Sequence, residues 1–338
     1  MKSKFVASAV LATLLSGSLA RAEGPPPVWT LDGQANFDVK ASSLEDYENH
    51  LRVQDAEIKF QLLVREGIKV VIKAELEQRL DPKLRQKDFD FQKVIEEAYN
   101  QIETDKVSGL PRAIITFGEH SMAFGQKYKE LPMFKDALIY GIAKQGEVIG
   151  LTVELPHNFF NIVDSVAISI FEAGSNDLEI AKEKGASFRL TKKVSDRLTA
   201  QVSGLIKELP NTDEKEKRGS IGLVFNSEDG KQKVWFEGII VNGNPKYKET
   251  TIGTQLGGSY KVGPGSIVLE YQYLQDQAHE LAAAYNLPVG TNLILSPEIR
   301  RRKDLSGTRP DETVIGIRAR IYAHLESKHK LLTGQKKD

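Results

Sequence analysis

The chain has 338 residues, of which 46 are Lys or Arg and 46 are Asp or Glu, and it contains no cysteine. Its formal charge of zero argues against a nucleic-acid-binding protein, which would normally carry a basic surface. The lack of cysteine excludes disulfides, thiolate catalysis and Cys-ligated metal centres. A bundle of membrane helices is excluded as well, because the mature chain has no run of about 18 apolar residues.

The N-terminus predicts a secretory signal peptide over residues 1–22. Lys2 and Lys4 precede an apolar stretch from Phe5 to Leu15, and Ala20-Arg21-Ala22 fits a small-residue cleavage site. The signal holds three basic residues and no acid, so cleavage would leave 316 residues with 43 basic and 46 acidic groups, a net charge of −3. We therefore expect an exported protein.

Apolar and polar residues alternate through most of the mature chain. At its start Trp29, Leu31, Phe37 and Val39 alternate with polar residues such as Asp32. In a strand, such alternating residues face opposite sides. Read in chain order, the pattern predicts sixteen strands over residues 28–40, 51–65, 68–79, 93–104, 112–118, 147–155, 165–173, 185–192, 197–207, 219–226, 232–242, 250–262, 266–276, 279–287, 291–302 and 312–325.

These strands would occupy over half of the mature chain, far more than in an ordinary globular domain. The connections after even-numbered strands are mostly short, as at Glu66-Gly67 and Gly263-Pro264-Gly265. Those after odd-numbered strands are mostly longer, as at 80–92 and 119–146. Short turns at one rim and long loops at the other are typical of an outer-membrane barrel. A soluble β-sandwich stays open as an alternative, because alternation alone does not separate the two folds.

We therefore predict an all-β fold, an antiparallel transmembrane β-barrel of about 16 strands over residues 23–325, followed by a polar tail over 326–338. Nine aromatic residues lie near predicted strand ends or at outward positions, where they could form interfacial girdles or pack in a sandwich core. They are Trp29, Phe37, Phe60, Tyr99, Phe117, Phe188, Phe225, Trp235 and Tyr247.

Residues 97–125 resemble a known family. Glu97-Ala98-Tyr99, the stretch from Arg112 to Gly118, and Ala123-Phe124-Gly125 are similar to the "EAY … RxGxF … PFG" pattern of Gram-negative outer-membrane porins. The resemblance is closest to the phosphate-selective porin group. It implies a trimeric channel protein and an inward-folded third loop that narrows the barrel.

That third loop would be the 28-residue connection 119–146. Its charged residues are the predicted constriction, since narrow walls of low dielectric concentrate the field of their charges. The alternative is an ordinary solvated external loop. The constriction residues are Glu119, Lys127, Lys129, Glu130, Lys135 and Asp136.

Charges on the inward positions of the strands form a second predicted site. They could set up a field across the pore, or they could merely pair across neighbouring strands. No uniform basic ladder is visible, so phosphate selectivity does not follow from the resemblance. The predicted wall residues are Glu57, Lys69, Lys73, Glu75, Arg189, Arg318 and Arg320.

The sequence lacks the short motifs of hydrolases, zinc proteases and nucleotide-binding proteins, so we expect no enzyme, no catalytic residue, no cofactor and no metal site. The predicted function is passive diffusion of small hydrophilic solutes through an outer-membrane channel. Expected partners are outer-membrane lipid, lipopolysaccharide and two further copies of the chain, with no nucleic acid. The alternatives are a non-channel barrel with a structural or surface role and a soluble periplasmic β-rich binding protein.

Overall fold

The computed structural model describes residues 28–43, 51–75, 95–108, 110–125, 138–139, 142, 147–156, 162–174, 184–209, 214–244, 247, 250–308 and 310–326. The predicted signal peptide and almost all of the predicted tail lie outside these residues. The strands are β1 Val28–Ser42, β2 Leu51–Arg65, β3 Ile68–Glu75, β4 Ile95–Glu103, β5 Ile114–Ser121, β6 Glu147–Leu155, β7 Ser165–Gly174, β8 Gly185–Lys193, β9 Leu198–Glu208, β10 Lys215–Asn226, β11 Gln232–Asn242, β12 Thr251–Val262, β13 Gly265–Leu274, β14 Ala278–Val289, β15 Leu293–Asp304 and β16 Glu312–Glu326. One short helix, α3 (Thr104–Val107), lies between β4 and β5.

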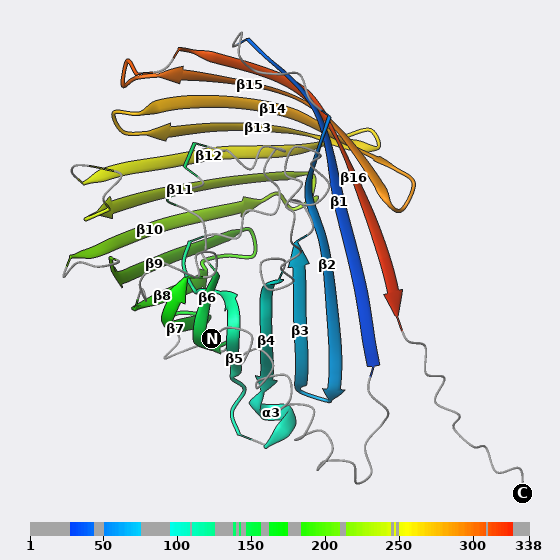
Figure 1. Ribbon diagram of the computed structural model, residues 1–338, viewed down its shortest axis with the longest axis vertical. Helices are drawn as coiled ribbons and strands as arrows, with labels where there is room; N and C mark the ends of the chain where they lie inside the picture. Colours follow the sequence, from blue (N-terminus) through cyan, green and yellow to red (C-terminus); the bar gives the residue numbers. More distant parts are fainter. Residues whose placement is uncertain are drawn as a thin grey trace, which may run out of the picture.

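Each strand pairs antiparallel with its neighbours in sequence, and the last strand pairs with the first. The closing pair runs from Thr30 opposite Glu326 to Ser42 opposite Val314. Figure 1 shows β1 lying beside β16 in the completed sheet. The predicted antiparallel barrel of sixteen strands is therefore confirmed.

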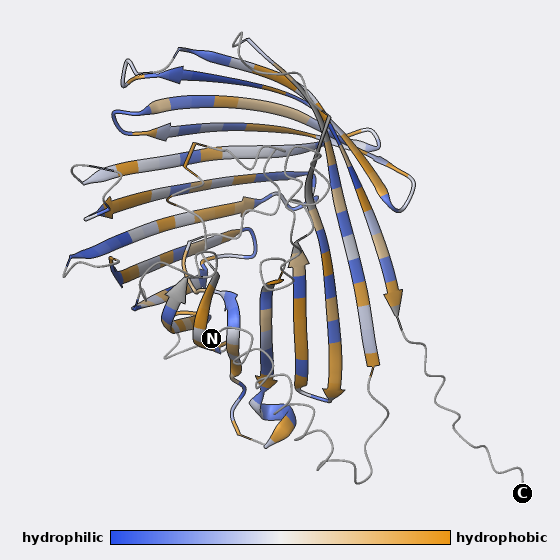
Figure 2. Ribbon diagram, viewed as in Figure 1, coloured by the Kyte–Doolittle hydropathy of each residue, from blue (hydrophilic) through white to orange (hydrophobic). Residues whose placement is uncertain are grey.

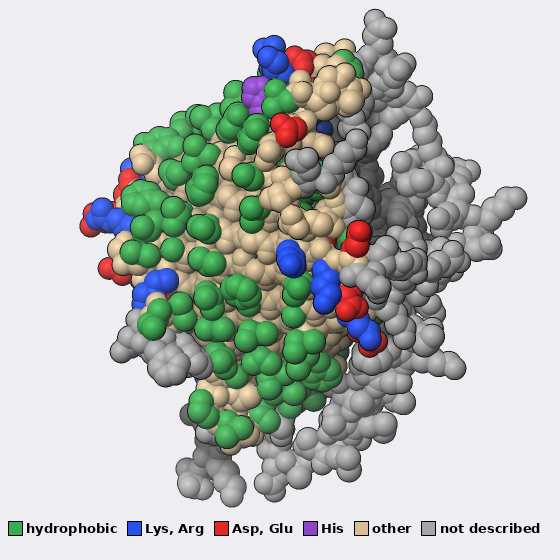
Figure 3. Space-filling view, turned by 90° about the vertical axis from the view of Figure 1, so that its left-hand side faces the viewer, with side chains coloured by type: hydrophobic (Ala, Val, Ile, Leu, Met, Phe, Trp, Pro, Cys, Tyr) green, Lys and Arg blue, Asp and Glu red, His purple; other side chains and the backbone are tan. Residues whose placement is uncertain are grey.

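The alternation in the sequence gives the barrel an apolar outer face and a polar inner face. On β13, Ile267, Leu269 and Tyr271 are 41%, 54% and 39% exposed, whereas the intervening Glu270 and Gln272 are 4% and 2% exposed. Figure 2 shows the same alternation along the strands, and Figure 3 shows hydrophobic side chains spread over the one outer face that it draws. A sandwich in water would instead expose its polar face.

Most of the short connections gather at one rim, which also holds the start of β1 and the end of β16; we call it the turn rim. Gly67 and Gly263 serve tight turns there with φ of +81° and +57°, a region that favours glycine.

Among the described residues, no helix is long and apolar enough to span a membrane.

The aromatic side chains divide between the two faces. Trp29, Phe188 and Phe225 are exposed on the outside, as expected. Trp235 and Tyr247 are 5% and 8% exposed and do not join an outer girdle. Trp235 lies on the inner face, in the same phase of β11 as Glu237, and Gly257 on β12, directly opposite, leaves room for the indole ring.

Candidate functional site: the inner face of the barrel

The connection after β5 begins by crossing the inner face of the neighbouring strands. The amide of Ala123 donates to Ser169 Oγ on β7 at 2.8 Å, and the amide of Gly125 donates to Ser203 Oγ on β9 at 3.0 Å. Phe124 is fully buried in a cluster with Phe171 and Leu205, among others. Residues 122–125 are therefore fixed to the wall by both hydrogen bonds and apolar packing.

Further along the same connection, Ile139 and Ile142 contact the next part of the wall, at β10, β11 and β13. The amide of Ile139 donates to Gln272 Oε1 on β13 at 3.0 Å, and Arg218 Nη1 on β10 donates to the Ile142 carbonyl at 2.9 Å. Both isoleucines are 1% exposed, in a cluster with Ile239, Val241, Tyr247 and Leu274. The described pieces of this connection thus follow the inward-facing side chains from β7 to β13.

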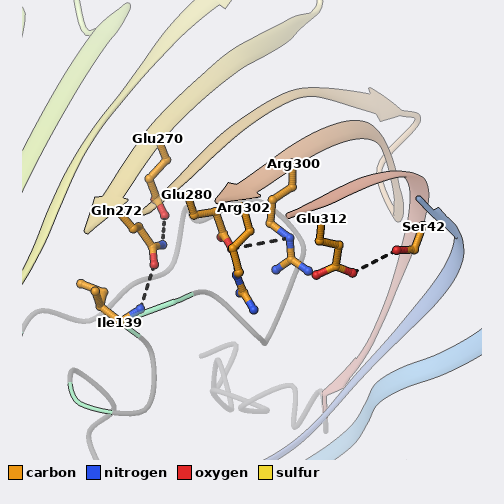
Figure 4. A network of polar contacts seen from close by, with 8 residues as sticks. All are labelled: Ser42, Ile139, Glu270, Gln272, Glu280, Arg300, Arg302 and Glu312. Carbon is orange, nitrogen blue, oxygen red and sulfur yellow. Dashed lines mark hydrogen bonds and ion pairs between the residues drawn. The ribbon is translucent and has the colours of Figure 1, made fainter. Parts of the chain in front are cut away.

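Beneath these contacts the wall carries buried carboxylates (Figure 4). Glu270 accepts hydrogen bonds from Gln272 and, at 2.8 Å, from Gln255 Nε2. Glu280 Oε2 lies 2.7 Å from Arg302 Nη2 and 3.7 Å from Arg300 Nε. Because buried charge is costly unless it is paired or hydrogen-bonded, these donors are what allow the carboxylates to remain on the wall.

The predicted wall residues are spread around the barrel. Lys73 Nζ on β3 lies 2.9 Å from Glu57 Oε1 on β2, and Arg320 Nε on β16 donates to Asn36 Oδ1 on β1 at 2.9 Å. Arg318 is 4% exposed. Lys69 lies opposite Leu63 and Gln101 in the register, and Arg189 opposite Ala167 and Ser203. The side chain of Glu75 lies outside the described residues.

The predicted constriction residues are mostly beyond the described part of the chain. Glu119 is described, at the end of β5, and is 5% exposed. Lys127, Lys129, Glu130, Lys135 and Asp136 fall outside the described residues.

The sequence analysis did not select the carboxylates of β10 to β15. These are Glu216, Glu237, Glu270, Glu280 and Glu298, each at most 4% exposed. The signal was present, since each occupies the polar phase of its strand. In a closed ring of sixteen strands, β10 and β11 lie eight strands from β2 and β3. Glu216 and Glu237 therefore face the side of the barrel that carries Lys69 and Lys73.

No group of three or more His, Asp or Glu side chains arranged to hold a metal ion occurs in the described part of the chain. His324 Nδ1 on β16 instead lies 2.6 Å from Asp32 Oδ1 on β1. This contact joins the first and last strands near the turn rim.

Neither a protein-family model nor a curated protein matches this sequence. Solved structures do match the fold. The outer membrane channel DcaP of Acinetobacter baumannii is 13% identical, with 88% of this chain and 96% of that chain covered and a TM-score of 0.59. An anion-selective porin from Comamonas acidovorans is 13% identical over 88% of this chain and all of the other, with a TM-score of 0.56.

OmpT of Vibrio cholerae, an outer membrane protein solved in a trimer form, is 11% identical, with 88% and 100% coverage and a TM-score of 0.62. At these identities the likeness establishes a shared fold.

Proposed function

We propose that the protein is an outer-membrane porin, a channel for passive diffusion of small hydrophilic solutes. The observation that carries the proposal is the closed sixteen-strand barrel with an apolar outside and a charged inside. In a bilayer every backbone polar group must be paired within the protein, and a closed sheet does so without free edges. The fold shared with a channel and a porin supports this function.

The test is single-channel recording of the detergent-extracted, folded protein in a planar bilayer under a salt gradient. We expect discrete conductance steps, and the sign of the reversal potential gives the charge preference. Folded protein that inserts and yet gives no steps would refute the channel and favour a structural or surface role.

We also propose that the connection 119–146 folds into the barrel and forms its constriction. Support comes from the anchors at Ala123, Gly125, Ile139 and Ile142, which all attach to inward-facing partners. A segment held between β9 and β13 would place the charges of residues 126–137 near the channel axis. Replacing Lys127, Lys129 and Lys135 by Glu should then shift the reversal potential toward cations. An unchanged potential would exclude these lysines from the constriction.

The remaining parts of the proposal concern class and assembly. We assign the chain to the non-enzymatic porins, near the phosphate-selective group that residues 97–125 resemble, acting in a Gram-negative outer membrane with lipid and lipopolysaccharide around it. A homotrimer is proposed because a protein of the same fold was solved as a trimer. Chemical cross-linking of the native protein should give dimer and trimer bands and nothing larger.

A further inference from the structure

A cavity of about 670 Å³ opens on the inner side of the turn rim, against the ends of β10 to β16. Its charged lining consists of Lys231, Lys233, Lys261 and Arg320, and none of the described residues that line it is Asp or Glu. None of the described residues of the connection 119–146 lines it. Its volume is within the range of sites for small organic ligands, about 300–1,000 Å³.

The cations of this cavity differ in how far they are neutralised. Arg320 donates to Asn36 Oδ1 and, at 3.4 Å, to Tyr322 Oη, and both of these partners are uncharged. Lys231 Nζ lies 3.7 Å from Asp229 Oδ2. The hydroxyl of Ser227 and the amide of Lys231 hold the pKa of Asp229 below its usual range, so Asp229 is ionised at neutral pH and offsets Lys231 in part. Arg320 therefore keeps its charge beside neutral partners, whereas the charge of Lys231 is offset in part.

The inward carboxylates of β11, β13 and β15 lie deeper in the barrel than this cavity, and each already has an interaction partner. Glu298 follows the lining residue Ser296 by two positions on β15, and Glu237 follows Lys233 by four on β11. Glu237 accepts a hydrogen bond from Ser220, and Glu270 from two glutamines. Near the rim, Asp32 binds His324 and, at 3.1 Å, Gln61. The described lining of the cavity is therefore cationic, while the carboxylates of β11, β13 and β15 lie farther along their strands.

Neutral hydrogen-bonding groups complete the lining. Ser259, Ser266 and Tyr322 bring hydroxyl groups into it. Ser296 Oγ donates to Asn286 Oδ1 at 2.8 Å, which leaves the amide nitrogen of Asn286 to act as a donor. Ammonium, guanidinium, hydroxyl and amide donors together match the oxygens of carboxylate and phosphate groups.

We propose that this cavity is a binding site for small multivalent anions that carry carboxylate or phosphate groups, at the periplasmic mouth of the channel. Short turns mark the periplasmic side of such barrels, which gives the site its orientation. A concave surface lined by charges of one sign raises the local concentration of solutes of the opposite charge. The site would hold an anion after passage through, or before entry into, the lumen.

The test is isothermal titration of citrate, and separately of inorganic phosphate, into the folded full chain in detergent at constant ionic strength. The variant Lys233→Gln with Lys261→Gln removes two lining charges. A matched control, Lys192→Gln with Lys193→Gln, removes two charges at the same rim, from residues that do not line the cavity. Heat-modifiable gel mobility checks that each variant is folded.

We expect saturable binding to the unaltered protein, weakened about tenfold or more in the first variant, equivalent to about 1.4 kcal/mol, and little changed in the control. Binding of one anion alone in this pattern supports the site and identifies its head group. No saturable binding of either anion, or equal binding by both variants, would overturn the proposal. Conductance without anion binding would refute this site but not the proposed channel function. Anion binding without conductance would support the site and refute the channel function.

Discussion

Gly257 leaves the room that the indole ring of Trp235 occupies on the inner face. A Cβ at Gly257 would overlap the indole ring on the adjacent strand. A Cβ on the neighbouring Gly258 would meet the Lys233 carbonyl at 3.5 Å and Val234 Cγ2 at 3.9 Å, both ordinary contacts. We predict that Gly257→Ala destabilises the barrel by about 1–3 kcal/mol, the usual cost of overpacking. Gly258→Ala is the matched control. Tryptophan fluorescence during urea unfolding measures both, and equal midpoints for the two variants would contradict the packing described here.

Arg218 is the residue that connects β10 to the connection 119–146. It donates to the Ile142 carbonyl and is itself paired with Glu216. A hydrogen bond from a charged donor contributes about 1.5–3 kcal/mol. We predict that Arg218→Gln releases this part of the connection often enough to make the single-channel conductance larger and noisier. Lys217→Gln, at the exposed neighbouring position, should leave the recording unchanged. Identical traces from Arg218→Gln and the unaltered protein would show that this contact does not hold the channel narrow.

At the scale of the strands, the outer face should respond to charge according to depth. Leu256 lies in the middle of β12 and is 52% exposed, whereas Val262 ends the same strand at the turn rim and is 40% exposed. An Arg at the bilayer midplane costs about 2–4 kcal/mol and near the interface about 0–1. We predict that Leu256→Arg strongly impairs folding into lipid vesicles and that Val262→Arg does not. Equal effects would argue against a membrane-spanning β12.

The strands were predictable because alternate residues face two different environments, an apolar one outside the barrel and a polar one inside, which gives the sequence a period of two. The bounds of β2, β6 and β11 agree with the predicted ranges 51–65, 147–155 and 232–242. β10 begins at Lys215 rather than at the predicted residue 219. The first four residues of β10, 215–218, are all charged, so both faces of the strand are polar where it reaches the rim. A search for alternating hydrophobic residues cannot detect such a segment.

The site was less predictable than the strands. A period of two assigns Glu216 and Glu237 to the inner face, but it does not show which strands lie opposite them. That depends on closure, which brings β16 to β1 and sets β10 and β11 across from β2 and β3. Likewise, the lining of the rim cavity comes from seven strands, and only the three-dimensional register places Lys233, Lys261 and Arg320 together.

For the whole molecule, function depends on one seam. The pairs along β1 and β16 are separated by almost the entire sequence, so the barrel exists only if the two ends of the chain meet. The contacts Asp32–His324 and Asn36–Arg320 fix the register of this seam from the inside. Without it the sheet would have two open edges, and neither a sealed lumen nor a stable position in lipid would follow.

The seam can be tested directly because the chain has no cysteine. Gly33 lies opposite Ala323, and a Cβ on Gly33 would be 3.6 Å from the Ala323 Cβ, within the usual range for a disulfide. We predict that the variant Gly33→Cys with Ala323→Cys oxidises readily to a bridge between the two ends. The cross-linked chain should migrate faster than its reduced form on a denaturing gel and should still refold into a conducting barrel.

The matched control pairs Gly33→Cys with Ala319→Cys. Ala319 is on the same face of β16 but lies opposite Phe37, four residues along the strand, or roughly 13 Å away at about 3.3 Å per residue. That distance is beyond the reach of a disulfide, so no bridge should form. If both pairs oxidise equally, the ends meet without a fixed register. If neither does, the barrel is not closed between β1 and β16, and a sealed channel is excluded with it.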